Sequence, residues 1–210
     1  MQCKYCRIRM KASDFDLVRD LKFDLERGIT TYGSDRMVIL HADALGLLRY
    51  QIIEEIGFER AREIFLRFGF RAGFSDALEM RVAYDWDTDR DLLEMAPRLH
   101  TYQGICRAET THVEIDIDDG ILHVKGHWYN SYEGSQHRMF YEESVEPVCW
   151  SQIGYAAGYG TGMMNTPVIS VEKQCIGAGH EYCTMESRIA DEWGAEADMY
   201  REAYGDLLDV

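Results

Sequence analysis

Four residues in the C-terminal half of the chain have side chains that bind metal ions: Cys149, Glu172, Cys175 and Cys183. Thiolate sulfur is a soft ligand that suits zinc, and four protein ligands with no vacant position are typical of a structural tetrahedral ion. Such an ion contributes about 10–16 kcal/mol of apparent binding free energy, comparable to the stability of a whole domain. We therefore expect a closed zinc site around which this part of the chain folds.

The spacing of these residues leaves the ligand set open. Glu172, Cys175 and Cys183 lie close together in the sequence, whereas Cys149 must come from a neighbouring element. His180 competes with Glu172, because a histidine is a more usual ligand of structural zinc than a carboxylate. A third alternative is a group of buried cysteines without a metal. The residue types alone slightly favour His180.

The other cysteines give weaker signals. Cys3 and Cys6 form a Cys-x-x-Cys pair in a polar segment, but no second pair follows at a suitable spacing. Cys106 stands alone and is expected to be a core thiol. We therefore assign no metal to these residues.

Apolar patterning predicts the elements that position the four metal-binding residues. Residues 150–160 predict a tightly packed helix after Cys149, and residues 168–171 predict a strand before Glu172. Residues 177–179 predict a turn before Cys183.

The rest of the chain predicts an α+β fold without the alternating rhythm of a doubly wound sheet. Helices at 35–56 and 59–79, separated at Gly57, predict a helical hairpin whose wide apolar faces pack in the core or against a second copy. A β-hairpin is expected at 112–117 and 121–128 around a turn at 118–120. Weaker predictions are a short capped helix at 13–21, a strand at 28–33, a short helix at 92–100 ending near Pro97, and a helix at 190–208.

The composition is that of an acidic globular protein. Of the 210 residues, 46% are hydrophobic and 12% are aromatic, and the formal net charge is −15. This charge disfavours direct contact with nucleic acid or anionic membranes, which are themselves negatively charged. No apolar run approaches the roughly 20 residues of a membrane span, and the N-terminal segment lacks the apolar stretch of a signal peptide. We therefore expect a cytoplasmic protein with reduced thiols.

A set of longer motifs resembles a known family. The motifs are residues 65–77, which contain Gly69-Phe70-Arg71-Ala72-Gly73-Phe74, and residues 97–104, 147–150, 154–156, 158–159 and the loop 172–183. Together they are similar to the N-terminal sensor domain of aromatic-responsive, sigma-54-dependent transcription activators of the XylR/DmpR/MopR type, in its phenol-responsive branch. The similarity extends over roughly residues 13–194.

The resemblance implies a sensor half, built from the helical hairpin and the β-hairpin, joined to a zinc-containing half of the four-vinyl-reductase type. It implies three cysteines and a glutamate as zinc ligands, so that Glu172 replaces His180 beside Cys149, Cys175 and Cys183. The implied regions are a dimerisation segment at 1–34, an aromatic-sensing region at 35–140, a zinc-binding region at 141–194, and the start of a linker to an ATPase domain at 195–210.

The resemblance also implies that His100 and Trp128 hold the hydroxyl of a phenol. The chemistry agrees, because an indole N–H donates to the hydroxyl oxygen and a neutral imidazole can accept its proton. A hydrocarbon would leave the buried imidazole unpaired, at a cost of about 1–3 kcal/mol. The rest of the pocket should be apolar, and its expected lining residues are Leu93, Leu99, Ile105 and Tyr159.

Three residues depart from the pattern of the family. Gly126 stands where relatives often carry a larger apolar residue, and Thr110 and Ser170 are also unusual. These changes can widen the pocket, so a substituted phenol is an alternative to phenol itself.

The expected function is therefore a sensor whose ligand relieves repression of a downstream ATPase. No phosphate-binding loop of the Walker type occurs in these 210 residues, so the ATPase and DNA-binding parts implied by the resemblance are expected outside this chain. A homodimer and the absence of catalysis are expected as well. Two rival classes are a zinc-dependent enzyme acting on an aromatic substrate, which would need an open metal position, and a zinc-folded interaction module without a small ligand.

Overall fold

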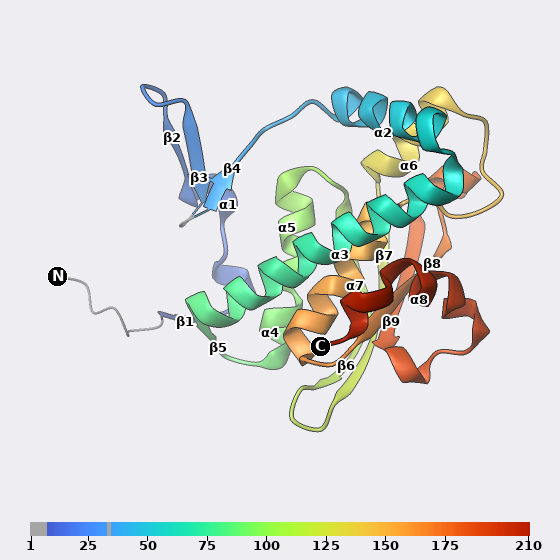
Figure 1. Cartoon of the computed structure of the whole chain (residues 1–210). Helices are drawn as coiled ribbons and strands as arrows, with labels where there is room; N and C mark the ends of the chain where they lie inside the picture. Colours follow the sequence, from blue (N-terminus) through green and yellow to red (C-terminus); the bar gives the residue numbers. More distant parts are fainter. Residues whose placement is uncertain (1–7, 33–34) are drawn as a thin grey trace.

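Two helices in backbone contact form the centre of the fold. The computed structural model describes residues 8–32 and 35–210, and in it α3 (Phe58–Ala83) crosses α7 (Trp150–Met164) (Figure 1). A Cβ atom at Gly73 would lie 2.1 Å from the carbonyl oxygen of Tyr155, and one at Gly158 would lie 1.9 Å from that of Phe70. Only glycine allows the two backbones to approach so closely, which explains the glycine-rich sequences of both helices.

A four-stranded antiparallel sheet packs against the other side of α7. Its strands are β6 (Arg107–Asp116), β7 (Ile121–Tyr129), β8 (Val168–Gln174) and β9 (Cys183–Ile189), in the order β6-β7-β9-β8. Gly160 of α7 faces the Val168 side chain of β8. The predicted β-hairpin, the strand after residue 168 and the helix after Cys149 are confirmed, and so is the α+β class.

The helical hairpin is present, but its first helix starts later than predicted. α2 (Ala42–Ile56) joins α3 at Gly57, whose φ of +81° suits glycine. The prediction of a helix from residue 35 is wrong, because Asp35–Met37 forms β4. This strand completes a small antiparallel sheet with β2 (Leu21–Asp24) and β3 (Ile29–Tyr32), so sheet hydrogen bonds replace helical ones.

The N-terminal segment contains only short elements. The predicted helix at 13–21 is reduced to a 3-10 turn at Ala12–Asp14 and to α1 (Leu17–Asp20), whose N-cap is Asp16. The predicted strand at 28–33 is confirmed as β3. β1 (Ile8–Met10) pairs in parallel with β5 (Tyr84–Trp86). Cys3 and Cys6 lie outside the described residues.

Two helices lie between β5 and the main sheet. They are α4 (Asp89–Leu93) and α5 (Met95–Gln103). The prediction that a helix ends near Pro97 is wrong: Pro97 lies in the first turn of α5, where a helix needs no backbone N–H. The short helix α6 (Tyr132–Phe140), capped by Ser131, was not predicted.

The C-terminal segment is not one helix. Residues 190–208 form 3-10 turns at Ala190–Glu192, Ala195–Ala197 and Gly205–Leu208 around α8 (Asp198–Tyr204). Gly194 and Gly205, the latter at φ +51°, interrupt the predicted helix. Trp193, Tyr200 and Tyr204 are buried, and Arg67 of α3 donates to the carbonyl oxygen of Tyr204 (2.6 Å). Among the described helices, none has the length and apolar character needed to cross a membrane.

Candidate ligand pocket and metal centre

Cys149, Glu172, Cys175 and Cys183 converge on one buried point. Cys149 precedes α7, Glu172 lies on β8, Cys175 follows β8, and Cys183 begins β9. The Sγ atom of Cys149 lies 3.6 Å from Sγ of Cys175 and 3.6 Å from Sγ of Cys183. Sulfur atoms at the corners of a tetrahedron around zinc are about 3.8 Å apart, because each Zn–S bond is about 2.3 Å long. The cluster can therefore hold a metal ion.

The surroundings of the cluster also fit a metal ion. Backbone N–H groups of Val148 and Ile176 donate to the sulfurs of Cys175 and Cys183 (3.4 and 3.3 Å). The Ser131 hydroxyl lies 3.1 Å from Sγ of Cys149. Oε2 of Glu172 accepts from the Cys149 N–H (3.0 Å), whereas its buried Oε1 has no partner among the described residues. A cation would satisfy this orphaned oxygen.

His180 is not part of this cluster. Its Nδ1 lies 3.2 Å from the carbonyl oxygen of Cys175, and the carboxylate of Glu172 occupies the fourth position of the cluster. The preference for His180 that residue types alone suggested is therefore not supported by the geometry. Burial raises the pKa of the Cys149 thiol and of the Glu172 carboxyl well above their usual values, so binding of a cation would release protons.

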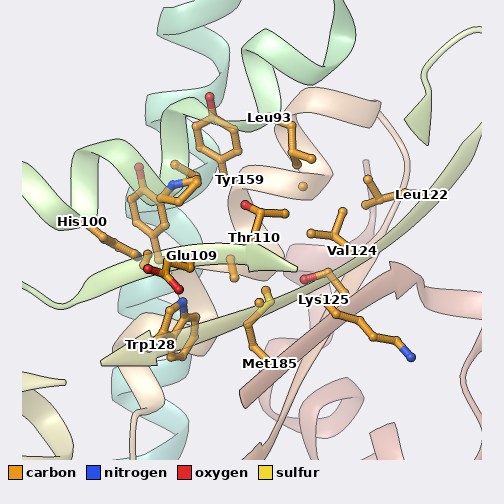
Figure 2. Close-up of a pocket in the computed structure, with 18 residues that line it drawn as sticks. Leu93, His100, Glu109, Thr110, Leu122, Val124, Lys125, Trp128, Tyr159 and Met185 are labelled. Atoms are coloured by element: carbon orange, nitrogen blue, oxygen red, sulfur yellow. The ribbon is translucent and has the colours of Figure 1, made fainter. Parts of the chain in front are cut away.

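A small cavity lies between α5, α7 and the inner face of the sheet (Figure 2). Its volume is about 60 Å³. His100 enters from α5, Trp128 from β7 and Tyr159 from α7, and Leu93 closes one side. The remaining lining residues are Ala96, Pro97, Ala108, Glu109, Thr110, Leu122, Val124, Lys125, Gly126, Tyr155, Ala156, Gly160, Met185 and Ser187. Apolar walls with a few polar side chains are typical of a small-molecule pocket.

His100 is the unusual residue of this cavity. Its side chain is buried, and within the part of the chain that the structure describes neither Nδ1 nor Nε2 has a hydrogen-bond partner. Burial lowers the pKa of His100 to about 4, so the imidazole is neutral near pH 7. Its ring packs against Tyr155, with the ring centroids 4.4 Å apart. An unpartnered neutral imidazole can donate to or accept from a bound ligand.

Tyr159 differs from His100, because its hydroxyl is already satisfied. The hydroxyl donates to the carbonyl oxygen of Leu92 (2.7 Å). Tyr155 likewise donates to Asp76 (2.7 Å). Both tyrosines therefore offer ring faces to the cavity, and His100 keeps the free polar atoms.

Two of the predicted lining residues, Leu99 and Ile105, do not line this cavity. α5 presents Ala96 and His100, one helical turn apart, whereas Leu99 is rotated by about 100° and packs in the core. Ile105 lies beyond the end of α5, where Gly104 at φ +74° turns the chain away. Ile105 instead lines a separate groove beside α2 and α3.

The sequence reasoning missed several residues of the cavity. Tyr155 lies one helical turn before Tyr159, so helical spacing alone could have indicated it. Met185 and Ser187 alternate along β9, but their strand could not be paired with β7 from the sequence. Gly126 and Thr110, which were noted as unusual, do line the cavity, whereas Ser170 lies behind it and hydrogen-bonds Ser187 (2.5 Å).

Comparisons with known families cover most of the chain. Residues 16–116 match the XylR_N family, described as "Activator of aromatic catabolism", and residues 128–189 match the four-vinyl-reductase domain family. The chain is 32% identical over 189 residues to the transcriptional regulatory protein XylR of Pseudomonas putida and 27% identical over 186 residues to the phenol regulator MopR of Acinetobacter guillouiae. These alignments cover 90% and 89% of this chain, but only 33% of each relative, so the chain spans about a third of their length.

A solved structure gives the same answer for the fold. The chain is similar to the phenol-responsive sensory domain of the transcription activator PoxR, whose crystal structure contains phenol. The TM-score is 0.85, the sequence identity is 36%, and the match covers 92% of this chain and 94% of that one.

Proposed function

This chain belongs to the family of activators of aromatic catabolism, as an N-terminal sensor domain, and from that membership we infer that it binds phenol or a substituted phenol in the cavity around His100. The observation that carries this proposal is the buried imidazole, whose two nitrogens have no partner among the described residues. A ligand hydroxyl would supply that partner, and an apolar ring would fill the remaining volume.

Trp128 and His100 divide the polar work in this proposal. The indole N–H donates only, so it suits the hydroxyl oxygen, and the neutral imidazole then accepts the hydroxyl proton. Toluene has a similar shape but no hydroxyl, and it would leave the buried imidazole unsatisfied. Gly126 supports the extension to substituted phenols, since it presents no side chain to the cavity.

Calorimetric titration with phenol, cresols, catechol and toluene tests the proposal. We expect saturable binding of at least one phenol and much weaker binding of toluene. Equal affinity for toluene and phenol, or no binding by metal-loaded folded protein, would refute it.

The proposed resident ion is zinc, held by Cys149, Glu172, Cys175 and Cys183. Three thiolates favour zinc over harder cations, and four protein ligands leave no open position. We therefore propose a structural role for the ion and no catalytic activity for this chain. The boundaries of this proposal remain a sensing region at 35–140 and a zinc-binding region at 141–194. Elemental analysis of the purified protein tests the identity of the metal.

The proposal for the whole protein is a cytoplasmic regulator in which ligand binding relieves repression of a downstream sigma-54-dependent ATPase. Residues 195–210 would lead towards that ATPase, although they pack on α3. The same proposal includes a homodimer formed through residues 1–80. Exposed apolar side chains on α2 and α3 support a second copy there: Leu47, Leu48, Ile56, Ile64 and Phe68. Light scattering of the native protein and of Phe68→Glu tests this interface.

A further inference from the structure

The outer face of the β6–β7 hairpin carries a second group of metal-binding side chains. His112, Glu114 and His123 each place one ligand atom within 4.8 Å of the others. The rings of the two histidines lie with their centroids 4.8 Å apart. The group lies on the sheet face opposite the cavity and is separate from the cysteine cluster.

A β-bulge creates this arrangement. Thr110 pairs with Gly126, but the next pair is His112 with Lys125, so Thr111 has no partner in the ladder. Before the bulge, Ala108 and Thr110 face the cavity. Without the extra residue, strand alternation would also turn His112 towards the cavity. The bulge instead points His112 outward.

The register then completes the group. Glu114 is the direct partner of His123 across the ladder, and His112 lies diagonally from His123. Directly paired side chains on one face of an antiparallel sheet are about 5 Å apart, and diagonal neighbours are also within reach of long side chains. The sheet therefore sets the spacing of all three residues.

Glu186 orients one of the histidines in the way that metal sites require. Its buried carboxylate lies 2.7 Å from Nε2 of His123. A hydrogen bond at this nitrogen leaves Nδ1 of His123 as the ring atom with a free lone pair. A histidine that ligates a metal almost always donates its other ring N–H to a carboxylate or carbonyl group in this manner.

We propose that His112, Glu114 and His123 form a second metal site, which takes a borderline divalent transition ion such as nickel or zinc. Two imidazoles and one carboxylate suit these ions better than magnesium or calcium, which prefer oxygen ligands. The ligands of one ion at about 2.1 Å lie roughly 3–4 Å apart, so the exposed side chains need only a small rotation to close on it.

The positive charges nearby do not compete for the carboxylate of Glu114. Lys173, Arg188 and Lys125 are directed at Glu186, with Nζ of Lys125 3.7 Å from its Oε1. Among the described residues, no ion pair engages Glu114. Its carboxylate therefore remains available to a cation.

Nickel uptake by the zinc-loaded protein tests the proposal. The protein is dialysed against NiCl₂, and nickel and zinc are quantified separately. We expect one nickel ion per chain in addition to the resident metal. His112→Ala and His123→Ala should each abolish saturable nickel binding while the zinc content stays unchanged, and Glu186→Gln should lower nickel affinity by about tenfold to a hundredfold.

His127→Ala is the matched control. His127 lies on the same outer face of β7 but contacts Tyr129 and Tyr182 instead of the proposed ligands. It should bind nickel like the native protein. No nickel uptake by the native protein, equal uptake by all variants, or uptake only by displacement of zinc would overturn the proposal.

Discussion

Trp128 in the wall of the ligand cavity is the direct ladder partner of Cys183 in the metal cluster. The two residues come from β7 and β9, so the backbone that holds the metal also holds the proposed hydroxyl donor. α7 adds a second connection, because Cys149 precedes its first turn and Tyr155 and Tyr159 line the cavity from its middle. The cavity and the metal cluster are therefore built on the same two elements.

Removal of the metal should weaken ligand binding as well as stability. Without a cation, the buried thiols and Glu172 repel one another and β9 loses its fixed position against β7. We expect Cys175→Ala, or treatment with a strong chelator, to lower the unfolding temperature and to abolish phenol binding. Differential scanning fluorimetry and calorimetry measure the two effects. A metal-free protein with native phenol affinity would show that the two sites are independent.

Loss of the imidazole should remove the preference for a hydroxyl. In His100→Ala, we expect phenol affinity to fall by about tenfold to a hundredfold, which corresponds to roughly 1–3 kcal/mol for a lost hydrogen bond in a buried site. Toluene affinity should change much less. Calorimetric titration of both ligands provides the measurement. His41→Ala, which removes an exposed histidine at the start of α2, is the control and should bind phenol normally.

Acidification should destabilise the ligand-free protein through His100. Burial lowers its folded-state pKa to about 4, whereas the unfolded value is near 6.5. Between these values the unfolded chain binds more protons, so stability falls as the pH falls from about 6.5 towards 4. This residue alone should cost about 2 kcal/mol between pH 7 and pH 5.

Urea unfolding at pH 7 and pH 5 measures this contribution. His100→Leu removes the titrating group, so its loss of stability between the two pH values should be smaller by about the same 2 kcal/mol. The comparison of variant and native protein cancels the protonation of the thiols, which both share. An equal pH dependence in both proteins would contradict the lowered pKa.

A side chain at position 126 should narrow the range of ligands. A Cβ atom there would lie 3.0 Å from the carbonyl oxygen of Glu109 and 3.4 Å from Sδ of Met185. We expect Gly126→Val to reduce the affinity for cresols more than the affinity for phenol. A panel titration checks this, with the unfolding temperature as a control for the fold. The same fractional loss for every phenol would mean that Gly126 does not set selectivity.

The contact between α3 and α7 should tolerate no added carbon. Gly158→Ala places a Cβ atom against the Phe70 carbonyl, so we expect a loss of about 1–3 kcal/mol or more in the free energy of unfolding. Urea unfolding measures it. Gly28→Asn is the matched control: it lies at φ +63° with nothing within 4 Å of a Cβ, and asparagine tolerates that conformation.

Local patterns predicted the long elements well. The β-hairpin around residues 118–120 and the helix after Cys149 have strong periodicity, and the structure contains both. The prediction failed where pairing with a distant segment decides the structure. Asp35–Met37 continues an apolar helical pattern but pairs with β3, and the C-terminal helix is interrupted by glycines that local periodicity does not weigh.

The candidate sites show the same division. The residues alone indicated the cysteines, but they favoured His180 over Glu172, and the resemblance to a family supplied the glutamate. His100 and Trp128 also came from that resemblance. The pairing of β7 with β9 could not be read from the sequence, and it is this pairing that brings Met185 and Ser187 to the cavity and Cys183 beside Trp128.

The unpaired Thr111 gives β6 two opposite assignments of inside and outside along its length. A deletion of this single residue would restore strict alternation and would exchange the neighbours of every residue on one side of it. Either Thr110 would be withdrawn from the cavity or a histidine and a glutamate would be driven into it. The length of this strand is therefore as tightly constrained as the identity of any side chain it carries.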